Sequence, residues 1–263
     1  MHTAGDVLVL ANVWDAASAR IVEDAGFPAL ATTSAGIAFA QGFPDGQKIS
    51  PGEMLKAVAR IAAAVGVPVT ADVEAGYGSA PEDAARTARG VIEAGAVGLN
   101  FEDATGDPAR PLFDLPLQLE RIRAICETSR KIGVPLVLNA RTDVYLAQVG
   151  DPATRYDESL RRLSAYRDAG ADCVFVPGIR DTDTMRRIVG DLKCPVNILA
   201  VPGSPSISEL AAMGVRRISL GSGPMRAAMG VVLRLVDELK TSGTYSQMEA
   251  APSHAQMNDL MRR

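Results

Sequence analysis

Histidine and cysteine are scarce in this sequence, and their scarcity excludes several common kinds of active site. The two histidines, His2 and His254, lie near the ends of the 263-residue chain. We therefore expect neither a histidine general base nor a histidine-rich zinc site. The three cysteines, Cys126, Cys173 and Cys194, lack the spacing of metal ligands, which is typical of a protein of the reducing cytoplasm.

The sequence also lacks a large excess of charge and any long apolar run. Its 27 Lys and Arg residues and 31 Asp and Glu residues leave a formal net charge of -4. We therefore expect no basic face for nucleic acid and no polybasic membrane anchor. No apolar run approaches the ~20 residues of a membrane helix. With 47% apolar and 22% charged residues, the composition is that of an ordinary soluble globular protein.

Motifs of covalent catalysis are absent as well. The chain contains no G-x-S-x-G nucleophile elbow, no P-loop, and no lysine at a predicted strand end where a Schiff base would form. These absences disfavour a covalent intermediate.

The pattern that is present is an eightfold alternation of a short apolar run and a helical stretch. The apolar runs have four to seven residues without polar alternation, which favours strands covered on both faces. The predicted strands are 7–13, 29–34, 67–73, 96–101, 134–140, 172–177, 195–200 and 216–220. The predicted helices are 15–25, 51–65, 81–93, 115–131, 156–169, 182–190, 206–213 and 224–239.

Capping residues support these helix boundaries. Ser50-Pro51-Gly52-Glu53 combines a capping serine, an early proline and a glutamate three residues on. Glycine follows the last apolar residue of five helices, at Gly26, Gly66, Gly95, Gly170 and Gly214. Eight alternating units predict an α/β fold, a (β/α)8 TIM barrel of ~250 residues. A doubly wound open sheet is the alternative, but its glycine-rich first turn is missing.

The last residues differ from the repeated units. Residues 241–263 are polar, with Met248, Met257, Leu260 and Met261 as apolar exceptions. We therefore divide the chain into a barrel catalytic domain, 1–240, and a C-terminal tail, 241–263. The tail is interpreted either as a frayed terminus or as an arm that packs on a neighbouring subunit.

Acidic residues follow several predicted strands at the same end. They are Asp45 in the loop after strand 2, Asp72 and Glu74 after strand 3, Glu102 and Asp103 after strand 4, and Asp143 after strand 5. In a barrel, the carboxyl ends of the strands and the following loops build the active site. Carboxylates gathered there predict a Mg2+ site, and Arg141 would offer a forked donor to an anionic ligand. The alternative is that these acids cap helices or pair with arginines.

A segment of small and hydroxylated residues follows strand 2. Thr32-Thr33-Ser34-Ala35-Gly36 has exposed N–H groups and hydroxyl donors, which is typical of an anion-binding nest. A helix-capping turn is the alternative interpretation of the same residues.

With these residues in place, the chain closely resembles the isocitrate lyase/phosphoenolpyruvate mutase superfamily, from about Val9 to about Leu233. The motifs that carry the resemblance are Asn12-Val13-Trp14-Asp15, Thr33-Ser34-Ala35-Gly36, Gly42-Phe43-Pro44-Asp45, Ala71-Asp72-Val73-Glu74-Ala75-Gly76-Tyr77-Gly78, Asn100-Phe101-Glu102-Asp103 and Asn139-Ala140-Arg141-Thr142-Asp143.

In that superfamily a Mg2+ ion holds a 2-oxo acid or its enolate. The resemblance implies that Asp72 is the main metal ligand here, with Asp45, Glu74 and Glu102 around the ion, mostly through waters. Mn2+ would be an alternative to Mg2+.

The resemblance also implies which residues contact the substrate. Thr33, Ser34 and Ala35 correspond to the segment that binds the substrate carboxylate, and Trp14 corresponds to an aromatic wall. Arg141 matches an arginine that contacts the ligand. Asn197 matches a polar residue that the superfamily carries on strand 7. Members of the superfamily are usually homotetramers that exchange their last helix, here 224–239, so a homotetramer or homodimer is expected.

Two departures from the superfamily bear on specificity. Its lyases carry a lid with a catalytic cysteine followed by Gly-His, whereas residues 104–111 read Ala-Thr-Gly-Asp-Pro-Ala-Arg-Pro. Pro177 also stands where the lyases have a glutamate. The chain therefore looks like a short-lid member, similar in that respect to the oxaloacetate decarboxylases.

The leading hypothesis is a cytoplasmic, Mg2+-dependent lyase that acts on a small 2-oxo dicarboxylic acid through a metal-stabilised enolate. Its catalytic candidates are Asp45, Arg141 and Glu102. Two alternatives remain: a hydrolase or phosphonomutase of C–C or C–P bonds on the same platform, and a non-catalytic 2-oxo acid binder.

Overall fold

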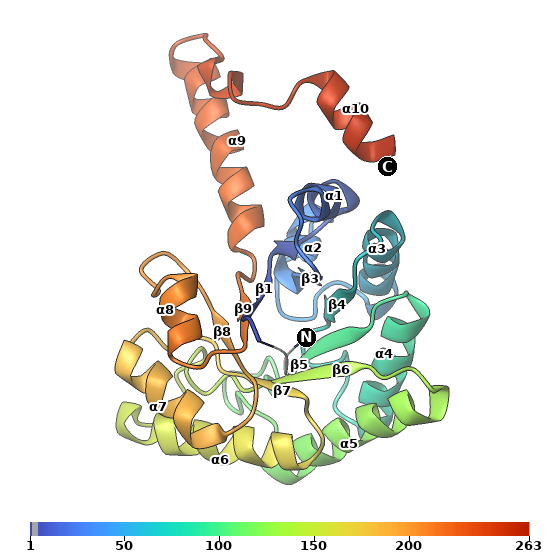
Figure 1. The fold of residues 1–263 in the computed structure, drawn as a ribbon, viewed down its shortest axis with the longest axis vertical. Helices are drawn as coiled ribbons and strands as arrows, with labels where there is room; N and C mark the ends of the chain where they lie inside the picture. The colour runs from blue at the N-terminus through green and yellow to red at the C-terminus, as the bar shows by residue number, and fades with distance from the viewer. Residues whose placement is uncertain (2–4, 263) are drawn as a thin grey trace.

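All strands that the structure describes run parallel and form one sheet that curls into a nearly closed barrel (Figure 1). The structure is a computed structural model that describes Met1 and residues 5–262. Its strands are β1 (Leu8–Leu10), β2 (Asn12–Val13), β3 (Leu30–Thr32), β4 (Val69–Asp72), β5 (Gly98–Glu102), β6 (Val137–Arg141), β7 (Cys173–Phe175), β8 (Val196–Leu199) and β9 (Arg217–Ser219). The predicted α/β barrel is confirmed.

The first predicted strand is divided into two short strands, and this division closes the barrel. β1 pairs with β9 at one edge of the sheet, whereas β2 pairs with β3 at the other. Ala11, between them, accepts a bond from the N–H of Ala31 at 3.3 Å. A single continuous strand was expected over 7–13, because an apolar run carries no signal for a change of pairing partner.

The helices surround the barrel and follow the predicted order. They are α1 (Ala16–Asp24), α2 (Ser34–Ala40), α3 (Pro51–Ala64), α4 (Pro81–Glu93), α5 (Leu115–Ile132), α6 (Arg155–Asp168), α7 (Thr182–Leu192), α8 (Ile207–Ala212), α9 (Gly223–Thr241) and α10 (His254–Arg262). As predicted, Ser50 caps α3: its hydroxyl accepts from the N–H of Glu53 at 3.2 Å.

Helix α2 was not expected. Thr33 is its N-cap, and the Thr33 hydroxyl accepts from the N–H of Gly36 at 3.3 Å, so the helix-capping interpretation of residues 32–36 is confirmed. The anion-binding interpretation of the same residues stays a prediction. The helix was missed because its residues, Ser-Ala-Gly-Ile-Ala-Phe-Ala, are buried on several sides and show no polar face.

The C-terminal part of the chain extends beyond the barrel. In Figure 1 α9 projects away from the strands, and the chain then returns through α10 toward α1. Many large apolar side chains of α9 are exposed: Met229, Val231, Val232, Leu233, Val236 and Leu239. Within the described residues, no helix combines the length and apolar character needed to cross a membrane.

Candidate active site

A polar pocket of about 300 Å³ opens at the carboxyl ends of the strands. Of the residues predicted to form the site, the structure brings seven into its wall: Thr33, Ser34, Ala35, Asp45, Asp72, Arg141 and Asn197. These residues come from five different segments of the chain, and the barrel brings these segments together at its carboxyl end.

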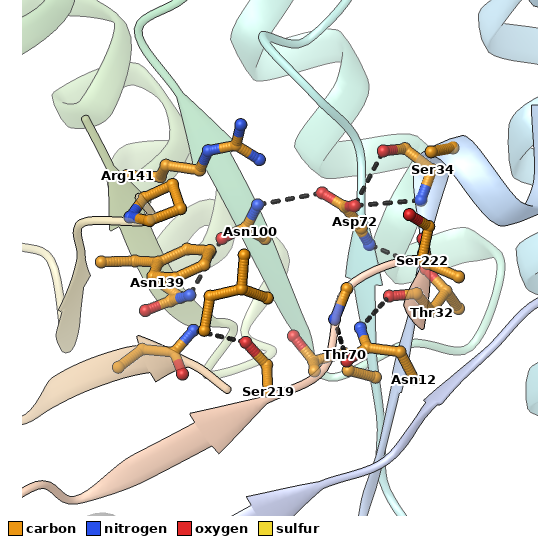
Figure 2. A pocket seen from close by; sticks show the side chains of 18 of the residues that line it. Asn12, Thr32, Ser34, Thr70, Asp72, Asn100, Asn139, Arg141, Ser219 and Ser222 are labelled. Carbon is orange, nitrogen blue, oxygen red and sulfur yellow. Dashed lines mark hydrogen bonds between the residues drawn. The ribbon is translucent and has the colours of Figure 1, made fainter. Parts of the chain in front are cut away.

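Asp72, at the end of β4, is held in the pocket by hydrogen bonds to α2 and to the two neighbouring strands, β3 and β5 (Figure 2). Its Oδ2 accepts from the N–H of Ser34 at 2.9 Å and from the Ser34 hydroxyl at 2.8 Å. Its Oδ1 accepts from Asn100 Nδ2 at 2.9 Å. The Asp72 N–H donates to the Thr32 hydroxyl at 2.8 Å. These hydrogen bonds orient the carboxylate before any ligand arrives.

A row of asparagines continues this network across the barrel. Asn139 Nδ2 donates to Asn100 Oδ1 at 2.9 Å, and Asn100 in turn donates to Asp72. Asn12 donates from Nδ2 to the carbonyl of Thr32 at 2.8 Å (Figure 2). These residues stand in the motifs quoted from the sequence, but no role was predicted for them. Strand register could have found them, because Asp72, Asn100 and Asn139 lie opposite one another.

Arg141, at the end of β6, is clamped between two carboxylates. Its Nη1 lies 2.7 Å from Glu102 Oε2, and its Nε and Nη2 lie 2.5 and 2.8 Å from the two oxygens of Asp143. Burial disfavours the charged guanidinium, but Asp143 and Glu102 raise the pKa of Arg141 above its usual value. The cation at the pocket wall is therefore permanent and rigidly held.

Glu102 and Glu74, two predicted metal ligands, do not line the pocket. Glu102 is engaged by Arg141, and burial raises its pKa well above the usual range. Glu74 Oε2 accepts from the N–H of Gln47, while its Oε1 is buried without a partner. Trp14 also lies outside the pocket lining and packs against the apolar cluster that contains Val13. The roles proposed for these three residues stay predictions.

Burial and the charge of Asp72 raise the pKa of Glu74 from 4.5 to about 7. The folded protein thus binds this proton more tightly than the unfolded chain, so stability falls as pH rises from 4.5 to 7. The contribution of Glu74 is on the order of 3 kcal/mol. We expect Glu74→Gln to reduce this fall when urea unfolding is compared at pH 5 and pH 8 in EDTA.

The exposed Glu82 provides the control, because Glu82→Gln should leave the pH dependence as in the wild type. An equal fall in stability for wild type and Glu74→Gln would show that the Glu74 carboxyl does not titrate in this range.

Asp103, next to Glu102, holds the loop after β6 in place through hydrogen bonds to Thr142 and Asp143. Its carboxylate is fully buried and accepts from the Tyr166 hydroxyl at 2.6 Å, the Thr142 hydroxyl at 2.7 Å and the N–H of Asp143 at 2.9 Å. Arg162 Nη1 lies 3.2 Å from it. Because Asp143 holds Arg141, Asp103 fixes the position of the pocket's arginine indirectly.

We expect Asp103→Ala to lower the free energy of unfolding by on the order of 3 kcal/mol, since it leaves buried donors and a buried guanidinium unpaired. Urea unfolding measures this loss. In the control Asp168→Ala, which breaks the surface pair with Arg167 at 2.8 Å, the loss should stay below ~1 kcal/mol. Equal effects of the two substitutions would contradict the anchoring role.

The donor set of the pocket fits a hard divalent cation held by few protein ligands. No group of three or more His, Cys, Asp or Glu side chains suited to a metal occurs among the described residues. Asp72 and Asp45 line the pocket, and Mg2+ needs only one or two carboxylates with water and ligand oxygens. Burial raises the pKa of Asp45, and the charge of Asp72 adds to the rise, so a cation between these two carboxylates would relieve their repulsion.

The fold and the pocket together define a class: a barrel enzyme with a firmly held carboxylate at the end of β4 and a firmly held arginine at the end of β6. The sequence profile of the phosphoenolpyruvate phosphomutase family matches residues 1–240. The chain belongs to this family, and so to the PEP mutase/isocitrate lyase superfamily of enzymes.

Relatives of the chain carry several descriptions. A Burkholderia cenocepacia J2315 protein provisionally described as a lyase/mutase is 41% identical, with a TM-score of 0.94 over 100% of this chain and 93% of that one. An oxaloacetate acetylhydrolase in complex with oxalate is 28% identical, with a TM-score of 0.85 over 97% and 89%. The oxaloacetate decarboxylase of Chromohalobacter salexigens is 31% identical over 83% of this chain and 76% of its own.

Proposed function

We propose that the protein is a carbon–carbon lyase that decarboxylates a small 2-oxo dicarboxylic acid, with oxaloacetate as the first candidate. The observation that carries the proposal is the pairing of a prepositioned carboxylate, Asp72, with a permanently charged, clamped Arg141 in one small polar pocket. Oxaloacetate decarboxylases and an oxaloacetate acetylhydrolase among the relatives support the same class of reaction.

In this proposal Asp72, with Asp45 nearby, would hold a Mg2+ ion, or Mn2+ in its place, which would supply positive charge to the 2-oxo acid end of the substrate. The substrate carboxylate lies against the start of α2, at Thr33, Ser34 and Ala35. Arg141 donates to the oxygen on which negative charge develops as CO2 leaves. Because Glu102 and Asp143 already orient Arg141, little reorganisation accompanies this step.

The loop after β5 is consistent with an open site. Ala104 and Leu112 form an antiparallel bridge, and the N–H of Thr105 donates to the carbonyl of Pro111 at 2.9 Å. None of residues 104–112 lines the pocket. Decarboxylation suits such a site, because CO2 leaves without an acid from a lid and water can protonate the resulting enolate.

The test is pyruvate release from a panel of 2-oxo and 2-hydroxy dicarboxylates, with Mg2+ or with EDTA. We expect EDTA-sensitive turnover of oxaloacetate above the rate that the metal alone produces. No turnover of oxaloacetate at any Mg2+ concentration would overturn the proposal.

A C–P bond enzyme is the second candidate, favoured by the phosphoenolpyruvate phosphomutase profile. Turnover of phosphonopyruvate in the same panel, without turnover of oxaloacetate, would move the assignment to C–P chemistry. Tight Mg2+-dependent binding of oxalate without any turnover would identify a 2-oxo acid binder.

We also propose that the protein is a homotetramer or homodimer in which α9, with the tail 241–263, packs on a neighbouring barrel. The exposed apolar face of α9 supports this assembly, because a row of such side chains is costly in water. The three cysteines, which form no disulfide, are consistent with a cytoplasmic protein.

Leu233 is 72% exposed in the single chain and lies at the middle of that face. We expect Leu233→Asp to shift the mass measured by light scattering from the oligomer to the monomer. Lys131→Asp, on the exposed surface of α5, changes charge away from α9 and should leave the mass unchanged. Identical masses for Leu233→Asp and wild type would argue against this interface.

A further inference from the structure

Arg217, on β9, is a buried arginine without a partner. Its side chain is 2% exposed, and its Nε is buried with no hydrogen bond. The guanidinium forms no hydrogen bond or ion pair within the described part of the chain. This contrasts with the buried Arg141 and Arg162, each of which contacts carboxylates. A buried charge without a partner costs several kcal/mol, so this one needs an explanation.

The position of Arg217 is the floor of the candidate active site. It lies opposite Asn197 on β8 and Leu8 on β1, and it lines the pocket. A second cavity, of about 250 Å³, lies at the other end of the strands and has mostly apolar walls. Arg217 and Thr70 line both cavities, so they separate the polar space from the apolar one. The apolar cavity cannot compensate the charge.

Cys173 and Asp72 are the ionisable groups that favour the charged form of Arg217, and neither forms an ion pair with it within the described residues. Burial raises the pKa of Cys173 to about 12, so this thiol is neutral at pH 7. Asp72 already accepts from Ser34 and Asn100. Burial lowers the pKa of Arg217, and Cys173 and Asp72 offset that effect only in part. The Arg217 guanidinium at the floor is therefore left without an ion-pair partner among the described residues.

Unpaired oxygens surround the same space. Thr70 Oγ1, Asn139 Oδ1 and Asn197 Oδ1 are buried without hydrogen-bond partners, and all three residues line the pocket. Buried polar atoms of this kind are normally satisfied by ordered water or by a ligand. A small anion on the guanidinium, with waters that donate to these oxygens, would satisfy both the charge and the orphaned acceptors.

We propose that Arg217 forms a second anion-binding site, at the floor of the pocket, that takes a carboxylate-sized anion. The anion is either the far carboxylate of a dicarboxylic substrate or a free inorganic ion such as chloride. This site lies deeper in the barrel than Arg141. It would explain why the barrel buries the Arg217 guanidinium, which has no part in the proposed reaction.

The first test is thermal unfolding of the apoprotein in acetate or chloride, at an ionic strength held constant with a bulky sulfonate. We expect the melting temperature of the wild type to rise by on the order of 5 °C near saturation, because the anion binds only the folded state. Arg217→Met should not respond to either anion. In the sulfonate alone it should melt at or above the wild-type temperature, because it lacks the unpaired charge.

Arg217→Lys keeps the charge and should retain part of the response, and Arg216→Met, at the exposed neighbouring position, should respond as wild type does. Equal responses of wild type and Arg217→Met, or no response of the wild type, would overturn the proposal. If Arg217→Met does not fold, the same decision follows from comparing how the melting temperatures of wild type and Arg217→Lys respond to the anions.

The second test identifies the source of the anion, and this part rests on the proposed function. If the far carboxylate of oxaloacetate occupies the floor, Arg217→Met should raise KM for oxaloacetate on the order of 10- to 100-fold. Inhibition by pyruvate should change little, and chloride should compete with oxaloacetate. If a free anion occupies the floor instead, Arg217→Met should weaken the binding of oxaloacetate and of pyruvate equally, and chloride should not compete with oxaloacetate. If oxaloacetate is not turned over, the proposed function fails while the thermal test still decides on the floor site.

Discussion

Replacement of Asp72 by asparagine should lower kcat/KM for the 2-oxo acid by on the order of 10³-fold. The side chain keeps its size, but it loses the negative charge that the donors around it are arranged to hold. Its new NH2 group would also face the donors of either Ser34 or Asn100, so that part of the network is lost. Steady-state pyruvate release at saturating Mg2+ measures the effect.

Asp107→Asn is the matched control for Asp72→Asn. Asp107 lies on the exposed loop after β5, where its carboxylate accepts from the N–H of Ala109 at 2.9 Å. Its variant should keep activity within about twofold of wild type. We also expect Mg2+ with oxalate to raise the melting temperature of wild type but not of Asp72→Asn. Activity of Asp72→Asn within tenfold of wild type would remove Asp72 from the centre of the reaction.

Replacement of Arg141 by lysine should lower kcat/KM by on the order of 10²-fold or more while keeping the positive charge. Lysine cannot reproduce the fork that contacts both oxygens of Asp143 and Glu102 at the same time. The cation would therefore be less rigidly placed toward the substrate. Kinetics at several Mg2+ concentrations would separate this loss from weaker metal binding.

Arg161→Lys controls for the loss of a forked arginine elsewhere. Arg161 contacts both oxygens of Glu158 at 2.8 Å on the surface of α6, and its side chain is 55% exposed. This variant should have wild-type activity and nearly wild-type stability. If Arg141→Lys were equally active, a point charge would suffice at this position and the role of the fork would be wrong.

Much of the barrel could be predicted because the local signals agreed with one another. Continuous apolar runs, capping serines and glycines after helices all marked the same alternating units. The division of the first strand and the short helix α2 were missed. The division depends on which strands become neighbours, and α2 is buried on several sides, so neither has a periodic signal in the sequence.

The candidate site was predictable only in part. The rule that strand ends converge placed Asp45, Asp72 and Arg141 in one pocket correctly. It could not show that Glu102 forms an ion pair with Arg141, or that the Glu74 carboxylate accepts a hydrogen bond from the N–H of Gln47. The choice of partner depends on side-chain directions and distances between segments far apart in the chain. Arg217 was overlooked because an arginine inside a predicted strand gives no indication of whether a carboxylate faces it.

By itself, the sequence determined the class of fold, the end of the barrel where chemistry takes place, and the residue types available there. Periodicity and capping act between near neighbours, so a linear sequence contains them in full. Tertiary structure decided which acidic side chains remain available to a ligand and which form ion pairs with arginines. It also decided that the buried Arg217 has no partner among the described residues. Those outcomes depend on burial and on the register between strands, and both exist only once the barrel has closed.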